Sequence, residues 1–324
     1  MEDSKKLDLY KKWFDNYSFF SCNTFVIEEI KFLWDITNII GLNFEYCTKT
    51  THGFLSEAAL EESVKLAQRY FDSHNIDINV NKEIENGNLY FIPIDKNNNS
   101  VTDGYSNFDK EQNKIIAYVQ YRNITYDSLV IIHELSHSSN QPNGGRGSVS
   151  EIFTEALAYT NELIACDELF DEDNKKAYFQ IFQRTAYYNY ACKIFNIYKV
   201  ILTYKNQKDI TEEKYNLEFD DNHYNEVMED FENYTNNHEL IFVDSYYIFG
   251  FALTIYMFME YKKDKNFFNK ITELNDSINN KDFKQCLNIV GIASLDDLTD
   301  KLDTSIKQFV KYVNSYYDAK VKSM

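Results

Sequence analysis

The spacing of apolar residues predicts helices at both ends of the chain. Apolar side chains recur every three or four positions in residues 25–36, and a stronger pattern runs from Ser56 to Phe71, where Ser56 can cap the helix and acidic residues follow in the first turn. From Tyr126 onward the helical period continues through long aromatic-rich segments at 175–205, 221–236, 244–262 and 303–318. The chain is therefore predicted to be mostly helical.

A different pattern occupies residues 76–122. Short runs rich in β-branched and aromatic residues alternate there with polar turn residues, and they cover Asn88–Ile94, Asp103–Phe108 and Asn113–Arg122. Runs of this length bounded by turn residues are typical of strands. We expect a small antiparallel β-sheet, so the predicted fold class is mainly α with one small antiparallel sheet.

The chain shows no linker-like segment and no internal repeat, which predicts a single domain over residues 1–324. Within it we expect a helical N-terminal part at 1–75, the small sheet at 76–122 and a second helical part at 123–324. Nine glycines and two prolines in 324 residues are too few for an all-β protein with frequent turns. The composition thus agrees with long helices.

The charge balance excludes some classes of partner. The chain has 33 basic and 51 acidic residues, a net charge of −18, which repels a phosphate backbone and argues against nucleic acid. Its longest uncharged run, Ser245–Met259, has fifteen residues and is too short to span a membrane. The N-terminus lacks the apolar region of a secretory signal, and the five cysteines are widely spaced. We expect a cytoplasmic protein with reduced thiols and no membrane partner.

The sharpest chemical signal is the segment His133-Glu134-Leu135-Ser136-His137, an HExxH motif. Residues four apart on an α-helix lie one turn apart on the same side, so both imidazoles can reach one metal ion. Zinc is the metal that this pattern indicates. Glu134, next to the first ligand, can take a proton from a metal-bound water molecule.

A catalytic zinc ion of this kind needs a third protein ligand. The next predicted helix offers Glu151, Glu155 and Glu162, which share one helical face, so periodicity does not choose among them. Ser148 and Glu151 form a capping-box pattern that gives Glu151 a structural role. Glu162 is better placed as an acceptor for the N–H of a ligand imidazole. Glu155 is the favoured ligand, and the other two remain alternatives.

These segments together resemble the catalytic core of the oligoendopeptidase F family, relatives of thimet oligopeptidase. The family's Gly-(Ala)-Tyr-Ser turn, its strand, its HELGHS helix and its E-x5-N-E helix match Gly104–Ser106, Ile115–Tyr121, His133–Ser138, and Glu155 with Asn161-Glu162. The resemblance extends more weakly to the C-terminal helices and covers most of the chain from about residue 56. It implies a zincin-like (gluzincin) metallopeptidase core in which His133, His137 and Glu155 bind zinc.

The chain departs from the family in three respects. Ser136 stands where the family has glycine, and the loop from His137 to Glu155 is shorter. Most of the family's N-terminal helices, which wall off a deep channel, have no counterpart, so the chain resembles a short member reduced to the catalytic core. The family stabilises the reaction's oxyanion with a histidine and a tyrosine. His238 and Tyr246 or Tyr247 lie in the corresponding segment, and His238 and Tyr247 are our candidates for this role.

The predicted function is hydrolysis of internal peptide bonds of oligopeptides by one zinc ion per chain, a zinc-activated water molecule and Glu134 as general base. We expect the strand at 115–121 to be an edge strand that pairs with the backbone of the peptide substrate. The alternative is a catalytically inactive helical protein that binds a metal or a peptide. The intact Glu134 argues against it, because a structural zinc site has no need of a base. The sequence leaves the oligomeric state open.

Overall fold

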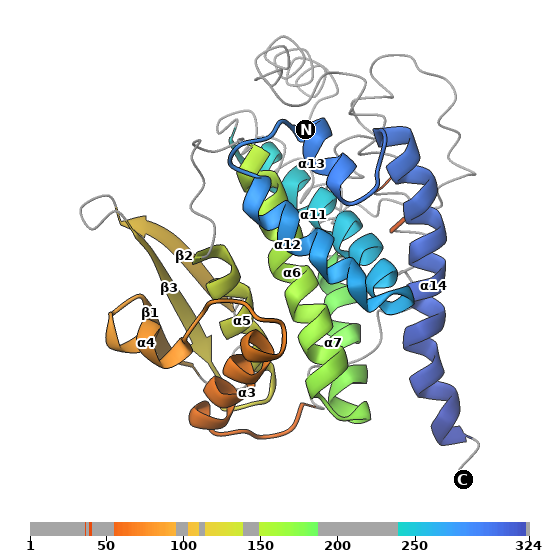
Figure 1. The fold of residues 1–324 in the computed structure, drawn as a ribbon. Coiled ribbons are helices and arrows are strands. Elements are labelled where there is room, and N and C mark those ends of the chain that lie inside the picture. The colour runs from red at the N-terminus through yellow and green to blue at the C-terminus, as the bar shows by residue number, and fades with distance from the viewer. Residues whose placement is uncertain are drawn as a thin grey trace, which may run out of the picture.

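The computed structural model describes Ile36, Ile39, Ile40 and residues 55–94, 103–109, 114–138, 149–186 and 239–321. In this part of the chain, a small sheet with short helices lies beside a larger group of long helices (Figure 1). The mainly helical class is confirmed.

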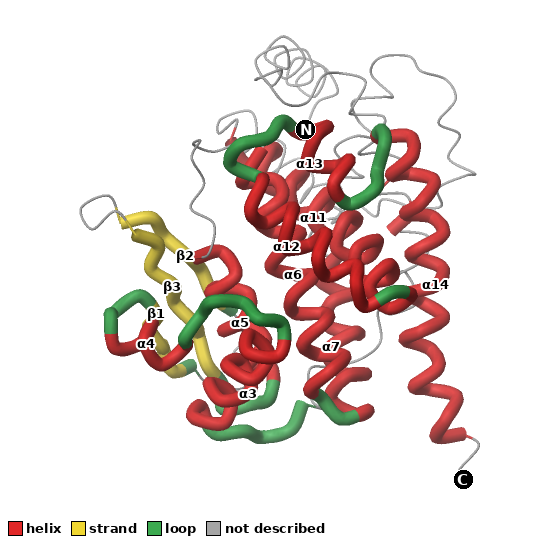
Figure 2. The backbone as a smooth tube through the Cα atoms, viewed as in Figure 1, coloured by secondary structure: helices red, strands yellow, loops and turns green. Residues whose placement is uncertain are grey.

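The sheet has three strands in the order β1-β3-β2, namely β1 (Leu89–Pro93), β2 (Gly104–Asp109) and β3 (Lys114–Tyr121) (Figure 2). β1 and β3 lie within their predicted segments, and β2 matches its segment to within one residue at each end. β2 pairs with β3 in antiparallel orientation, whereas β1 pairs with β3 in parallel orientation. The expectation of an entirely antiparallel sheet is therefore corrected to a mixed sheet. The strand order explains this. After β1 the chain forms β2 at the opposite edge of the sheet, and β3 then inserts between them, antiparallel to β2 and parallel to β1.

The same order corrects the expectation that residues 115–121 form an edge strand. β3 is hydrogen-bonded on both sides, to β1 and to β2, so its backbone has no free edge for a substrate. One face of the sheet turns Ala117 and Val119 towards the core. On the other face the aligned rings of Tyr105, Tyr118 and Tyr90 stack across all three strands. β2 thus forms one edge of the described sheet, with alternate residues on opposite faces.

The helix that carries the HExxH motif is α5 (Tyr126–Ser138), which packs between β3 and α6 (Val149–Leu169). Its residues Leu129–Ile132 are all buried, as expected for a helix that is covered on several sides. α3 (Leu60–Ser73) also packs on α5, and α4 (Val80–Glu85) packs on β1. α3 begins after Ala59, so the expected capping by Ser56 is wrong. Ser56 instead exchanges hydrogen bonds with Asn174.

The remaining helices build a layer on the far side of α6. α11 packs against α6, and α14 packs against α11. The elements of this layer are α7 (Glu172–Arg184), α11 (Glu239–Lys263), the 3-10 turn η4 (Lys265–Phe267), α12 (Phe268–Ser277), α13 (Phe283–Ile289) and α14 (Leu295–Val321). The predicted helices 244–262 and 303–318 lie within α11 and α14. The predicted segment 221–236, and 187–205 of another, lie outside the described residues. Among the described helices, none combines the length and the apolar character needed to cross a bilayer.

Candidate metal centre and active site

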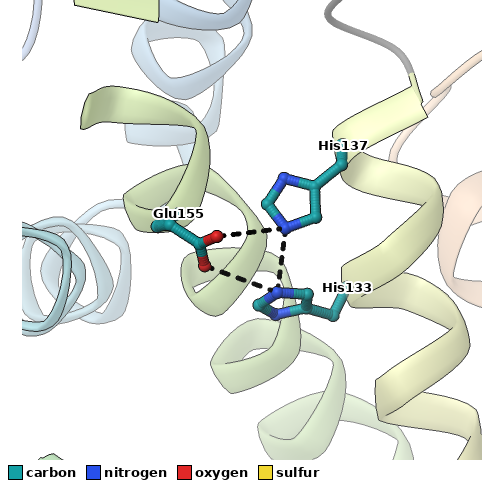
Figure 3. A group of neighbouring side chains, drawn as sticks. All are labelled: His133, His137 and Glu155. Atoms are coloured by element: carbon teal, nitrogen blue, oxygen red, sulfur yellow. Dashed lines mark hydrogen bonds and ion pairs between the residues drawn. The ribbon is translucent and has the colours of Figure 1, made fainter. Parts of the chain in front are cut away.

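Two helices bring three potential ligands together. His133 and His137 project from α5 on the same side, and their Nε2 atoms lie 3.0 Å apart. Glu155 reaches them from α6, with Oε2 3.6 Å from His133 Nε2 and Oε1 3.6 Å from His137 Nε2 (Figure 3). Within the described part of the chain, these three residues are the group whose ligand atoms gather in one place, all within 4.8 Å of one another.

The spacing of these atoms fits a tetrahedral metal ion. Metal–nitrogen bonds of about 2.0–2.1 Å at tetrahedral angles place neighbouring ligand atoms about 3.3 Å apart, close to the distances observed. Oε2 of Glu155 is also buried without a hydrogen-bond partner among the described residues. A buried carboxylate oxygen that accepts no hydrogen bond is costly, and a metal ion would satisfy it. The donor set of two imidazoles and one carboxylate therefore fits a metal site.

The structure distinguishes the three glutamates of the α6 segment by what they reach. Glu155 faces both imidazoles, as described above. Glu162, two turns further along, hydrogen-bonds His133 Nδ1 through Oε1 and accepts a 2.6 Å hydrogen bond from the Tyr178 hydroxyl on Oε2. This contact occupies Nδ1 and leaves Nε2 of His133 for a metal. Glu151 lies in the first turn of α6, and its side chain is outside the described part of the structure.

The position of Glu155 depends on a close approach between α6 and α11. A Cβ atom built on Gly250 of α11 would lie 3.3 Å from Glu155 Cβ and 3.5 Å from the backbone nitrogen of Ala156. One turn later, the Thr254 hydroxyl donates a 3.0 Å hydrogen bond to the Ala156 carbonyl. A glycine followed four residues later by a small polar residue thus lets α11 lie against the ligand-bearing turn of α6.

Burial and neighbouring charges shift the pKa values of the three candidate ligands, one upward and two downward. Burial lowers the pKa of His133, but Glu162 and Glu155 outweigh it and hold that pKa well above its usual value. Burial lowers the pKa of His137 to about 4; Glu155 acts in the opposite direction, and the charge of His133 adds to the lowering. Burial raises the pKa of Glu155, yet His137, His133 and a hydrogen bond from Tyr247 lower it overall.

Glu134 is buried beside the ligands, with only 4% of its surface exposed. Burial raises its pKa to about 7, although His133 and a hydrogen bond from Ser106 act in the opposite direction. The Ser106 hydroxyl donates this 2.6 Å bond to Oε2 from strand β2. Residue-by-residue reasoning assigned Ser106 no role. Its only signal was the Gly104–Ser106 motif of the family resemblance.

The serine that replaces the family's glycine is accommodated by a buried chain of hydrogen bonds. The Ser136 hydroxyl donates to the Ile132 carbonyl at 2.7 Å and accepts a 3.0 Å bond from Asn161 Nδ2. Oδ1 of Asn161 in turn accepts a 2.7 Å bond from the Tyr70 hydroxyl of α3. These bonds connect α5, α6 and α3.

Of the candidates for oxyanion stabilisation, the structure describes the side chain of Tyr247. Tyr247 lies on α11, half-buried, and its hydroxyl hydrogen-bonds Glu155. Tyr247 therefore lies beside one of the three candidate metal ligands. His238 lies outside the described residues, and so does the side chain of Tyr246.

Comparisons with known proteins place the fold. No family model matches the sequence, and no curated protein matches it either. Among solved structures, the chain aligns over 95% of its length with a provisionally named oligoendopeptidase F from Bacillus anthracis str. Ames, with a TM-score of 0.63 and 12% identity. The fold is that of oligoendopeptidase F. A provisionally named peptidase from Chlamydophila abortus also aligns over 95% of the chain, with 15% identity and a TM-score of 0.48.

The chain spans about 60% of the length of the Bacillus anthracis oligoendopeptidase F structure. The oligoendopeptidase F-like fold that the resemblance implied is confirmed at the level of architecture.

Proposed function

We propose that the chain is a zinc-dependent metallopeptidase that hydrolyses internal bonds of oligopeptides, with one zinc ion held by His133, His137 and Glu155. The observation that carries this proposal is the meeting of these three ligands next to the buried carboxyl group of Glu134. The peptidase name of the Bacillus anthracis protein, which has a similar fold, supports a peptide as substrate. Two imidazoles and one carboxylate form a donor set typical of catalytic zinc, and they leave a fourth position open.

When bound, zinc supplies Lewis-acid chemistry: it polarises the carbonyl group of the peptide and lowers the pKa of a water molecule. The chain supplies the proton transfers. The Glu134 carboxylate accepts a proton from the attacking water, whose oxygen bonds to the scissile carbonyl carbon. The same carboxyl group then donates that proton to the amide nitrogen as the C–N bond breaks, which releases an amine and a carboxylic acid.

Residues around the ligands hold this arrangement in place. Glu162 accepts the Nδ1 hydrogen of His133 and so presents Nε2 to the metal. We assign Tyr247 as the hydrogen-bond donor to the developing oxyanion, because its hydroxyl already lies against Glu155. The role of His238 as a second donor remains a prediction from the resemblance.

The test is hydrolysis of a quenched fluorescent nonapeptide by zinc-loaded wild type and by Glu134→Gln. We expect Glu134→Gln to keep one zinc ion per chain and to lose activity by at least about a hundredfold, since it removes the base but no ligand. Equal activity in the two proteins would refute the assignment. A zinc-loaded wild type that binds peptides without cleaving them would favour the inactive binding protein instead.

A further inference from the structure

Strand β2 contacts both oxygens of the Glu134 carboxyl group. The Ser106 hydroxyl lies 2.6 Å from Oε2 and 3.4 Å from the backbone carbonyl oxygen of Glu134, so its hydrogen is directed to the nearer carboxylate. A Cβ atom on Gly104 would lie 2.5 Å from Oε1 and 2.9 Å from Cδ and Cγ. The Glu134 side chain therefore rests against the bare Cα of Gly104.

The two contacts come from one face of one strand. Gly104 and Ser106 are alternate residues of β2, so both point the same way, while Tyr105 between them points to the opposite face. Antiparallel pairing aligns Gly104 with Val119 and Ser106 with Ala117 of β3. β3 packs on α5, which bears Glu134. The position of Ser106 relative to Glu134 is thus set by the sheet and not by a loop.

Because Glu134 is buried, its orientation depends on the hydrogen bond from the Ser106 hydroxyl. The carboxyl group is almost entirely buried, and Ser106 is the hydrogen-bond donor that the described residues offer it. Oε1 accepts no hydrogen bond from the described residues. A buried carboxylate that loses its donor turns towards another partner or takes up a proton. One hydroxyl therefore determines which way the carboxylate faces and which oxygen stays free.

We propose that Ser106 and Gly104 are positioning residues for the general base. Ser106 binds Oε2 and leaves Oε1 to take the proton of the attacking water, and Gly104 provides the space in which the carboxylate lies. This inference rests on the proposed peptidase function, and it adds two residues that act on the reaction only through Glu134. A side chain at position 104 would overlap with Oε1, Cδ and Cγ of Glu134. We expect the carboxyl group to move in response, while the fold and the metal ligands stay in place.

The catalytic test compares Gly104→Ala, Ser106→Ala and Ser106→Thr with the wild type. We expect kcat to fall about 10- to 100-fold in both alanine variants, with KM and zinc content unchanged, because a displacement of about 1 Å costs on this order. Ser106→Thr keeps a hydroxyl and should recover most of the loss. Asn107→Ala is the matched control, since this exposed neighbour on β2 faces away from Glu134. Unchanged kcat in Gly104→Ala and Ser106→Ala would overturn the proposal.

A second measurement does not depend on activity. Urea unfolding of Ser106→Ala, Glu134→Ala and the double variant forms a double-mutant cycle. We expect non-additivity of at least about fivefold in the unfolding equilibrium constant, and additive effects would overturn the contact on which the proposal stands. If the wild type cleaves no peptide but the cycle is non-additive, the peptidase function fails while the positioning contact is upheld.

Discussion

The Nδ1 atom of His133 is hydrogen-bonded to Oε1 of Glu162, which lies seven residues after Glu155 on the same helix. α6 thus supplies both the carboxylate that faces the metal position and the one that orients a ligand imidazole. The Tyr178 hydroxyl completes this arrangement from α7 by donating to the second oxygen of Glu162.

We expect Glu162→Gln to bind zinc about 10- to 100-fold more weakly, because the neutral amide holds the His133 ring less firmly and lowers the basicity of Nε2. Zinc affinity can be measured by competition with a chromogenic chelator. Glu168→Gln is the control, because Glu168 lies on the same helix and contacts His74 and Lys265 instead. Equal zinc affinity in both variants would show that Glu162 does not orient the ligand.

The close approach at Gly250 leads to a prediction about zinc affinity without a change of ligand. Gly→Ala in a helix usually stabilises a protein by about 1 kcal/mol. At Gly250 the new methyl group must push against Glu155 Cβ, so we expect this gain to be absent and zinc affinity to fall several-fold. Urea unfolding and zinc titration check the two effects.

Thr254→Val serves as the control for this prediction. It removes a hydrogen bond between α11 and the Ala156 carbonyl but adds no bulk near Glu155. We expect it to cost about 1 kcal/mol of stability and to leave zinc affinity unchanged. A full stability gain in Gly250→Ala together with normal zinc binding would contradict our account of the helix contact.

The stability of the fold should depend on the buried hydrogen bonds that connect Tyr70, Asn161 and Ser136. Tyr70→Phe leaves Oδ1 of the buried Asn161 without this donor, and we expect it to lower the free energy of unfolding by about 1–3 kcal/mol. Tyr90→Phe, on the exposed face of the sheet, should change it by less than about 0.5 kcal/mol. Similar losses of unfolding free energy in the two variants would show that the Tyr70 hydroxyl contributes no more to stability than an exposed one.

The lowered pKa of Glu168 predicts that the stability of the fold depends on pH. Burial raises its pKa, but hydrogen bonds from His74, Lys265 and Tyr261 outweigh this and lower the pKa to about 2. Because the pKa is lower in the folded than in the unfolded state, Glu168 stabilises the fold above about pH 4.5, and this contribution disappears as the pH falls towards 2. Wild type should exceed Glu168→Gln in unfolding free energy at pH 7, and the difference should vanish near pH 2. A difference independent of pH would refute this.

Much of the site follows from local geometry, which the sequence alone determines. The four-residue spacing of His133 and His137 on a helix brings their imidazoles to one point, whatever the rest of the chain does. The same spacing fixes Glu134 next to the first ligand. Periodicity also placed Glu155 and Glu162 on one face of the next helix. The three strand segments were likewise readable from their composition and from the turns between them.

Only the tertiary structure decided how these elements meet. Glu155 rather than Glu162 faces both imidazoles because of how α5 and α6 pack, and Gly250 lets α11 lie close to the turn of α6 that carries Glu155. β3 is the central strand because it pairs with both β1 and β2. Local sequence patterns do not encode which strands pair. The contact of Ser106 with Glu134 follows from that pairing. Positions within one element are set by backbone geometry, whereas distances between elements depend on how their side chains pack.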